Sequence, residues 1–312
     1  MSSHPRTEAQ VLVVGSVNVD LTVRTQRIPG PGETVTGTGP KINPGGKGAN
    51  QAVAAAKLGA TVAMAGAVGR DVYADVATQE LRAAGVDLTH LLVTEGPCGM
   101  AFITVDDHGE NVIVVTPGAN AHMSADRIDT LRPALEQADV VVLQGEIPPT
   151  AIEKAIGLTC GRVLLNLAPA IDLAFPSLLA ADPLVVNETE GRIVLARFGQ
   201  GAASDQDDEA VVADLVGHGI RSLIMTRGSR GAIVADASGT TPVASPSVDV
   251  VDTTGAGDAF VGALASALAN GDTLLEAAKL AVRVGAYACT GHGAQPSYPT
   301  STDRLPGEGT HG

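Results

Sequence analysis

A glycine-rich turn followed directly by a carboxylate carries the clearest chemistry in this sequence. Gly255, Ala256 and Gly257 form the turn, Asp258 follows, and apolar residues then recur at a spacing of four through residue 268. Backbone N–H groups at such a helix N-terminus stabilise negative charge, on a bound phosphate or in a transition state. A carboxylate repels an anion bound beside it, so its presence favours a role as proton acceptor. The pattern indicates phosphoryl transfer to a hydroxyl group, with Asp258 as the general base.

Taken alone, the same motif is more typical of an aspartate that only stabilises the first turn of its helix. The rest of the sequence has to decide between the two interpretations. With 312 residues, 45% of them hydrophobic and 17% charged, the chain can bury the core of one α/β domain with an insertion, or of two domains.

The net charge of −14 bears on the class of partner. Binding to a nucleic-acid backbone needs clustered Lys and Arg, and no such run exists in the sequence, so we expect no nucleic-acid partner. An acidic chain can still bind a nucleotide through backbone N–H groups and a metal ion. The charge therefore excludes one class of phosphate ligand and leaves the other open.

Cysteine usage and hydropathy predict the compartment. Cys98, Cys160 and Cys289 are widely spaced and odd in number, without a CxxC pair, which favours unpaired thiols in a reducing cytosol. Residues 1–10 are polar. No apolar run approaches the ~20 residues that span a membrane. We expect a cytoplasmic protein without membrane association.

The middle of the sequence alternates between strand and helix patterns. Short apolar, β-branched runs predict strands at residues 11–15, 61–65, 139–143, 162–167, 183–186 and 222–226. Helix patterns at residues 47–58 and 73–84 are each closed by a glycine, Gly59 and Gly85. Such alternation predicts a mainly parallel sheet covered by helices on both faces. We expect a single α/β domain over residues 9–300.

Two segments interrupt this alternation. Residues 21–41 are rich in Gly and Pro among alternating Thr and Val, and residues 99–115 read as a hairpin with its turn at residues 106–109. Together they predict a small antiparallel sheet inserted into the core, with one face covered by a ligand cleft or by another subunit. The polar, Gly-rich residues 301–312 are expected to form a disordered tail.

Polar residues follow several predicted strands, where open α/β sheets bind their ligands. Asn18 and Asp20 follow the first strand, Glu146 follows residues 139–143, and Lys47 and Asn50 belong to a glycine-rich loop. These groups suit the hydroxyls of a polyol. The alternatives are local: an Asx-turn after the first strand, and a tight turn that merely begins a helix.

Two further segments allow both a ligand and a structural interpretation. Asn187 and Glu190 have the spacing of a capping box, but as hard oxygen ligands they could also organise Mg²⁺. Residues 226–231 could contact phosphate through Thr226 and glycine N–H groups, or form a hairpin turn. The sequence contains no P-loop, no HExxH zinc spacing and no GxSxG elbow, and neither of the stretches that begin at Gly15 and Gly45 spells GxGxxG.

In this order, the motifs around residues 45–52 and 252–258 resemble the two signatures of the ribokinase-like (PfkB) carbohydrate kinase family. The resemblance extends over residues 11–299. It implies a three-layer α/β/α sandwich with a mainly parallel sheet and a small antiparallel β lid. It also implies ATP-dependent phosphorylation of D-ribose at O5 with Mg²⁺ as cofactor and K⁺ as activator, and a homodimer formed through the lid.

The resemblance carries roles to individual residues of this chain. Asp258 is implied as the base, with Gly255, Ala256 and Gly257 as the anion hole. The residues implied to hold the sugar are Asn18, Asp20, Gly46, Lys47, Asn50, Glu146 and Asp258. Those implied for the nucleotide and its magnesium are Asn187, Glu190, Thr226, Gly228, Ser229, Gly231 and Gly257. Those implied for potassium are Asp252, Thr254, Ala288, Gly291, Gly293 and Ser297.

The resemblance leaves several acceptors open. Lys47 and Asn50 favour ribose over fructose-type acceptors, whose kinases usually lack the lysine. Deoxyribose, a nucleoside or a fructose derivative stays open as the acceptor; Arg24 and Arg27 in the first inserted segment would suit a phosphorylated sugar. A non-catalytic sugar-binding regulator is disfavoured because Asp258 and the anion hole are intact. Val282, Arg283 and the Gly291-His292 pair depart from the family pattern near the expected adenine and potassium sites.

Overall fold

Short β-branched runs of this chain form one central sheet in the computed structural model, which describes residues 10–199 and 207–307. In spatial order its strands are β14 (Gly239–Val243), β13 (Ala232–Asp236), β12 (Leu223–Thr226), β11 (Leu184–Asn187), β10 (Arg162–Asn166), β9 (Val140–Gln144), β1 (Val11–Val14) and β4 (Val62–Ala65). The strands from β12 to β4 are parallel, whereas β13 and β14 pair antiparallel at one edge.

Alternate side chains of each strand enter different cores. In β1, Val11 and Val13 belong to one apolar cluster, whereas Leu12 and Val14 belong to a second cluster on the other face. Because both faces are covered, the strands read as continuous apolar runs instead of alternating ones. All of the strands predicted for this sheet are present, with ends that differ by one or two residues.

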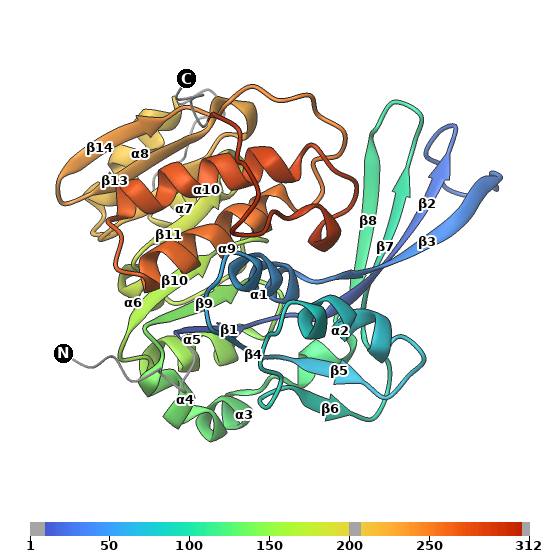
Figure 1. Ribbon diagram of the computed structural model, residues 1–312, viewed down its shortest axis with the longest axis horizontal. Helices are drawn as coiled ribbons and strands as arrows, with labels where there is room; N and C mark the ends of the chain where they lie inside the picture. The colour runs from blue at the N-terminus through green and yellow to red at the C-terminus, as the bar shows by residue number, and fades with distance from the viewer. Residues whose placement is uncertain (1–9, 200–206, 308–312) are drawn as a thin grey trace.

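Helices cover both faces of the sheet (Figure 1). The helices on the first face are α1 (Lys47–Lys57), α2 (Ala74–Ala83), α9 (Ala256–Ala269) and α10 (Leu274–Ala288). Those on the second face are α3 (Ala125–Thr130), α4 (Arg132–Gln137), α5 (Pro149–Leu158), α6 (Phe175–Ala180), α7 (Glu188–Arg197) and α8 (Asp208–Gly217). The predicted three-layer α/β/α sandwich is therefore confirmed.

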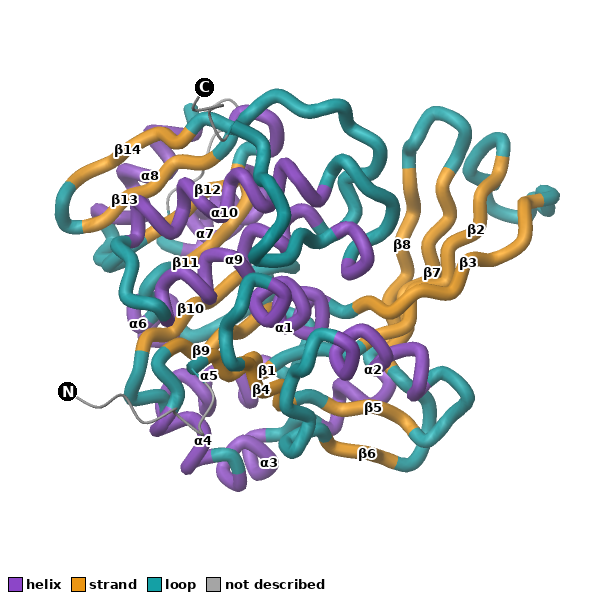
Figure 2. Tube along the Cα trace, in the orientation of Figure 1, coloured by secondary structure: helices purple, strands orange, loops and turns teal. Residues whose placement is uncertain are grey.

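A second sheet projects from the body of the molecule, and we call it the lid (Figure 2). In spatial order its strands are β3 (Gly37–Gly45), β2 (Asn18–Thr25), β7 (Gly99–Val105) and β8 (Asn111–Thr116). The outer pairs are antiparallel as predicted, but the central pair of β2 and β7 is parallel. A hairpin connects only sequential strands, so sequence could predict β7–β8 but not which strand β7 meets on its other side.

The remaining elements are short. Strands β5 (Ala67–Gly69) and β6 (Leu92–Thr94) pair in parallel as a third small sheet. The 3₁₀ turns are η1 (Gly118–His122), η2 (Gly228–Arg230) and η3 (Gln295–Ser297). Within residues 10–199 and 207–307, no helix has both the length and the apolar character needed to cross a bilayer.

The predicted disordered tail is wrong for its first half. Leu305 is buried, the N–H of Ser301 donates to the Lys57 carbonyl at 3.0 Å, and Arg283 Nε donates to the Pro306 carbonyl at 2.9 Å. Residues 301–307 therefore pack against α1 and α10, and residues 308–312 lie outside the described part of the chain. The polar composition hid this because its contacts are made mainly through backbone groups.

Helices α1 and α9 approach each other closely at Gly262. A Cβ atom on this residue would lie 2.5 Å from the Ala54 Cβ and 2.6 Å from the Gln51 carbonyl oxygen. Real Cβ atoms do not approach other atoms this closely, so a side chain here would push the helices apart. The contact matters for function because α1 carries Asn50 and α9 carries Asp258.

We therefore expect Gly262→Ala to destabilise the protein by about 1–3 kcal/mol, the usual cost of overpacking a core, despite the better helix propensity of Ala. The matched control is Gly157→Ala in α5, where an added Cβ meets nothing within 4 Å. Chemical denaturation should show lower stability for the first variant and unchanged or higher stability for the second. Equal stability of the two variants would show that α1 and α9 can separate freely.

Candidate active site

The carboxyl ends of the parallel strands converge where the lid joins the core. The chain leaves β1 between its neighbours β4 and β9, so this end of β1 is a point where the strand order changes direction. Asn18 lies just after β1, Gln144 ends β9 and Asn166 ends β10. The fold thus brings polar residues from distant parts of the sequence to one edge of the sheet.

Asp258 lies in the first turn of α9, whose N-terminus no side chain caps. Gly255 precedes the helix with a φ of 75°, and its added Cβ would lie 2.5 Å from the Tyr298 hydroxyl, so only glycine fits there. Tyr298 donates to the Gly255 carbonyl at 3.1 Å. Above Gly257, in contrast, an added Cβ would meet nothing within 4 Å. Tyr298 thus fixes the turn that precedes the helix, whereas the space next to Gly257 stays open to a ligand, as an anion site requires.

The Asp258 carboxylate is only 8% exposed and is bound through both oxygens. Asn50 Nδ2 donates to Oδ2 at 2.9 Å, and Gln51 Nε2 donates to Oδ1 at 2.9 Å. A buried carboxylate needs such donors to remain ionised. Sequence reasoning placed Asn50 near Asp258 but missed Gln51, although Gln51 is the next residue of the same helix.

Lys47 and Glu146 meet at the start of α1. Glu146 Oε2 accepts from the backbone N–H of Lys47 at 3.1 Å and from the Ser16 hydroxyl at 2.5 Å. The negative charge of Asp258 is the main cause that raises the pKa of Lys47, with Glu146 and Asp20 acting in the same direction against burial. One ammonium group therefore faces several carboxylates.

Asn18 is buried in the same region, at 3% exposure. Its Oδ1 accepts from Asn120 Nδ2 at 2.7 Å, and Asn120 Oδ1 accepts from the Val17 N–H at 3.0 Å. Asn120 belongs to η1, more than 100 residues away in sequence. No motif marks Asn120, so this contact could not be predicted from local sequence patterns.

Asp20 lies on the face of β2 that looks toward these charges. Burial, followed by the negative charges of Glu146 and Asp258, raises the pKa of Asp20 from its usual 3.8 to about 7, although Lys47 lowers it. Between these two pH values the folded protein keeps a proton that the unfolded chain has released. The contribution of Asp20 to stability therefore decreases as the pH rises through this range.

We expect the ligand-free protein to lose stability between about pH 5 and pH 7.5, and Asp20→Asn to lose less, since an amide has no proton to release. Thermal melts at constant ionic strength measure this difference. The matched control is Asp107→Asn, an exposed carboxyl in the turn between β7 and β8. Parallel pH profiles for the wild type and Asp20→Asn would contradict the assignment.

Asn187 and Glu190 form the capping box that was one of their two interpretations. Asn187 Oδ1 accepts from the Glu190 N–H at 2.8 Å, and Glu190 Oε2 accepts from the Asn187 N–H at 2.8 Å. Glu190 Oε1 takes no part in the box. Burial is the main cause that raises the pKa of Glu190. The positive charge of Lys47 lowers this pKa, and the negative charge of Asp258 raises it. Its carboxylate therefore faces the same site.

Residues 226–231 form the hairpin turn that was their alternative interpretation, since η2 joins antiparallel strands β12 and β13. Gly231 has a φ of 84°, and an added Cβ would lie 2.0 Å from the Val243 carbonyl oxygen. Arg230 pairs with Glu188 at 2.7 Å and with Asp208 at 2.8 Å. These pairs hold the turn, which contains Gly228 and Ser229, beside the N-terminus of α7.

The residues implied for potassium lie together around Asp252. Its Oδ2 accepts from the Gly293 N–H at 2.9 Å, and its Oδ1 accepts from the Thr254 N–H at 2.9 Å and hydroxyl at 2.6 Å. An added Cβ on Gly291 would lie 3.0 Å from the Ser297 Cβ. Ala288 ends α10 just before this loop. A carboxylate and neighbouring backbone carbonyls are the hard oxygen ligands that such a cation prefers.

No cluster of three or more His, Cys, Asp or Glu suited to a metal occurs in residues 10–199 and 207–307.

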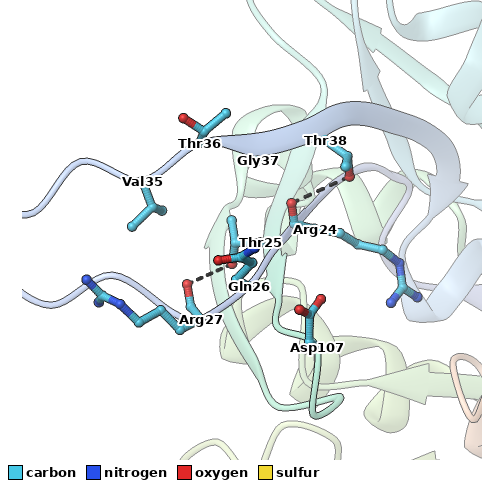
Figure 3. Close-up of a pocket in the computed structure, with 9 residues that line it drawn as sticks. All are labelled: Arg24, Thr25, Gln26, Arg27, Val35, Thr36, Gly37, Thr38 and Asp107. Atoms are coloured by element: carbon cyan, nitrogen blue, oxygen red, sulfur yellow. Dashed lines mark hydrogen bonds between the residues drawn. The ribbon is translucent and has the colours of Figure 1, made fainter.

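A separate hollow lies at the outer end of the lid (Figure 3), and its lining residues are Arg24, Thr25, Gln26, Arg27, Val35, Thr36, Gly37, Thr38 and Asp107. None of these residues belongs to the site around Asp258. Arg27 is paired with Glu33. The hollow therefore gives no support to a phosphorylated sugar held by Arg24 and Arg27 beside Asp258.

A parallel sheet with a projecting lid, together with a buried carboxylate in front of an open helix N-terminus, defines a kinase of small hydroxyl compounds with the ribokinase-like fold. The sequence matches the pfkB family carbohydrate kinases over residues 8–301. The chain belongs to this family, and its members are phosphotransferases with an alcohol group as acceptor.

Individual relatives cover nearly the whole chain. It is 36% identical to the ribokinase of Haemophilus influenzae, over 94% of this chain and 96% of the relative. It is 37% identical to the deoxyribokinase of Salmonella typhi, over 93% of this chain and 95% of the relative. The structure of Arabidopsis thaliana ribokinase complexed with ribose and ATP superposes with a TM-score of 0.82 and 29% identity, covering 95% and 97% of the two chains.

Proposed function

We propose that this protein transfers the γ-phosphoryl group of ATP to O5 of D-ribose, giving D-ribose 5-phosphate. The observation that carries the proposal is the Asp258 carboxylate, which two amides hold in front of the open N-terminus of α9. Asp258 takes the proton of the attacking hydroxyl, and the N–H groups of Gly255, Ala256 and Gly257 stabilise the transferring phosphoryl group.

The sugar binds among Asn18, Asp20, Lys47 and Glu146, under the base of the lid. These side chains combine carboxylates, an amide and an ammonium group, which suits a ligand with several hydroxyls. Asn50 has a second Nδ2 hydrogen for the sugar besides the one donated to Asp258. Relatives called ribokinase and deoxyribokinase are equally similar to this chain, so deoxyribose is the second candidate acceptor.

The nucleotide lies along the strand ends on the other side of Asp258, near residues 226–231, and brings its magnesium ion to Glu190. The free Oε1 of Glu190 fits this role, directly or through a water molecule of the ion. Bound magnesium neutralises charge on the phosphates. Asn187 acts by fixing the Glu190 side chain through the capping box.

Potassium binds in the loop around Asp252, where the side chain and the backbone carbonyls of Thr254, Ala288, Gly291 and Gly293 supply oxygen, with Ser297 beside them. This loop touches the anion site directly, because an added Cβ on Gly255 would lie 2.5 Å from the Ala294 Cβ. A cation here stabilises the negative charge that the α9 N-terminus receives. We propose cytoplasmic function, consistent with three unpaired cysteines and ATP as co-substrate.

ADP release with a panel of acceptors tests this proposal. We expect ribose to give the highest kcat/KM, deoxyribose less, and nucleosides and fructose derivatives least, with lower rates in Na⁺ than in K⁺. Asp258→Asn keeps the shape of the side chain but removes the base, so its kcat should fall about 10²–10⁴-fold.

Wild-type turnover by Asp258→Asn would exclude the general-base mechanism. Sugar binding without ADP release by the wild type would instead favour a non-catalytic sugar-binding protein. Equal rates in K⁺ and Na⁺ would exclude the cation site but leave the reaction intact.

The lid also supports a homodimer. Ile42, Leu21, Phe102 and Val114 lie side by side across the lid strands, in paired register. Because strand side chains alternate, this row faces away from Asp20 and the sugar site. Ile42, Phe102 and Val114 are 44%, 43% and 58% exposed. An apolar row of this length on a solvent-exposed sheet face suits burial against the same row of a second copy.

Phe102→Glu should therefore convert the protein to monomers, because it places a charge at the centre of the apolar row. Ile193→Glu is the matched control, since Ile193 is 46% exposed on α7 in the body of the molecule. Light scattering after size-exclusion chromatography measures both masses. A wild-type protein that is monomeric at micromolar concentration would contradict the proposed dimer.

A further inference from the structure

Two chains of buried amide side chains converge on the Asp258 carboxylate. In the first chain, Gln144 Nε2 donates to Gln51 Oε1 at 2.8 Å, and Gln51 Nε2 donates to Asp258 Oδ1 at 2.9 Å. In the second chain, Gln295 Nε2 donates to Asn50 Oδ1 at 2.8 Å, and Asn50 Nδ2 donates to Asp258 Oδ2 at 2.9 Å. Each oxygen of the carboxylate thus ends one chain.

The direction of every hydrogen bond in these chains follows from the carboxylate. An ionised carboxylate only accepts, so Asn50 and Gln51 must turn their NH₂ groups toward it and their oxygens away. Those oxygens can then only accept, so Gln144 and Gln295 must also present NH₂ groups. The amide orientations are therefore set by chemistry and not by an arbitrary assignment.

Packing alone does not account for these side chains. Gln51, Gln144 and Gln295 are all fully buried, at 0% exposure, in a region where apolar side chains of the same size would avoid the cost of desolvating an amide. Within the described residues, Oε1 of Gln144 and Oε1 of Gln295 accept no hydrogen bond, whereas their NH₂ groups both donate toward Asp258. Gln144 and Gln295 therefore take part in these chains through their NH₂ groups and not through their oxygens.

We propose that Gln51, Gln144 and Gln295 are positioning residues for the general base. Donors aimed at the carboxylate stabilise its ionised form, and aligned amides strengthen one another by polarisation. With one donor fixed on each oxygen, the remaining lone pairs point in defined directions toward the acceptor hydroxyl. The proposal rests on the assignment of Asp258 as general base.

The test compares Gln51→Met, Gln144→Met and Gln295→Met, each close in size to the side chain it replaces. We expect kcat near neutral pH to fall about tenfold or more in Gln51→Met, which loses a hydrogen bond to a charged group, and less in the two outer variants. The acid limb of the kcat–pH profile should move to higher pH in the same order, with the KM for ATP unchanged.

The double variant Gln51→Met/Gln144→Met separates a chain from independent contacts. If Gln144 acts only through Gln51, its replacement adds nothing once Gln51 is gone. Thr78→Val is the control for loss of a buried hydrogen bond elsewhere, because the Thr78 hydroxyl donates to the Ala74 carbonyl at 2.8 Å inside α2. It should lower the melting temperature and leave the pH profile unchanged.

The outcomes distinguish this inference from the proposed function. Wild-type pH profiles and kcat in all three Met variants, together with an inactive Asp258→Asn, would overturn the positioning role alone. Turnover by Asp258→Asn would overturn the base itself. If Gln51→Met does not fold, the two outer variants decide, since either a shifted acid limb or its absence is measurable in them.

Discussion

The ionised carboxylate of Asp258 has to be stabilised inside a region of nearly apolar helices, and the arrangement around it follows from that requirement. Burying an unpaired charge would cost far more than a protein of this size can tolerate. Asn50 and Gln51 supply the hydrogen bonds, and Lys47 supplies the nearby positive charge. All three belong to α1, so α1 must lie directly against α9. Small residues at that contact, Gly262 among them, make the approach sterically feasible.

The same close approaches link the core to the lid. Strand β2 begins at Asn18 and β3 ends at Gly45, so both lid strands start or finish inside the candidate site. An added Cβ on Gly45 would lie 2.2 Å from the Asp20 carboxylate, and one on Gly46 would lie 2.7 Å from the Asn18 N–H. The absence of side chains at these two glycines therefore allows the loop to pack directly against β2. A movement of the lid would therefore displace the residues proposed to hold the sugar.

Local patterns predicted well those features that depend on neighbouring residues. The strands of the central sheet, the glycine closures of α1 and α2, the hairpin of β7 and β8, and the capping box of Asn187 and Glu190 all depend on a few consecutive positions. Features that depend on distant partners were missed. Nothing local marks Asn120 as the partner of Asn18, or residues 301–307 as packed, because those contacts join segments far apart in the chain.

Sequence by itself determined the α/β class and the family, because both depend on residue types and short spacings, and it predicted Asp258 as the candidate base. It left Asp258 open to two interpretations, since a helix-stabilising aspartate and a general base look alike in one dimension. The tertiary structure decided that its two oxygens are bound by separate amide chains from α1, β9 and η3. The physical reason is that burial and hydrogen-bond direction are properties of the assembled interior, which no single segment contains.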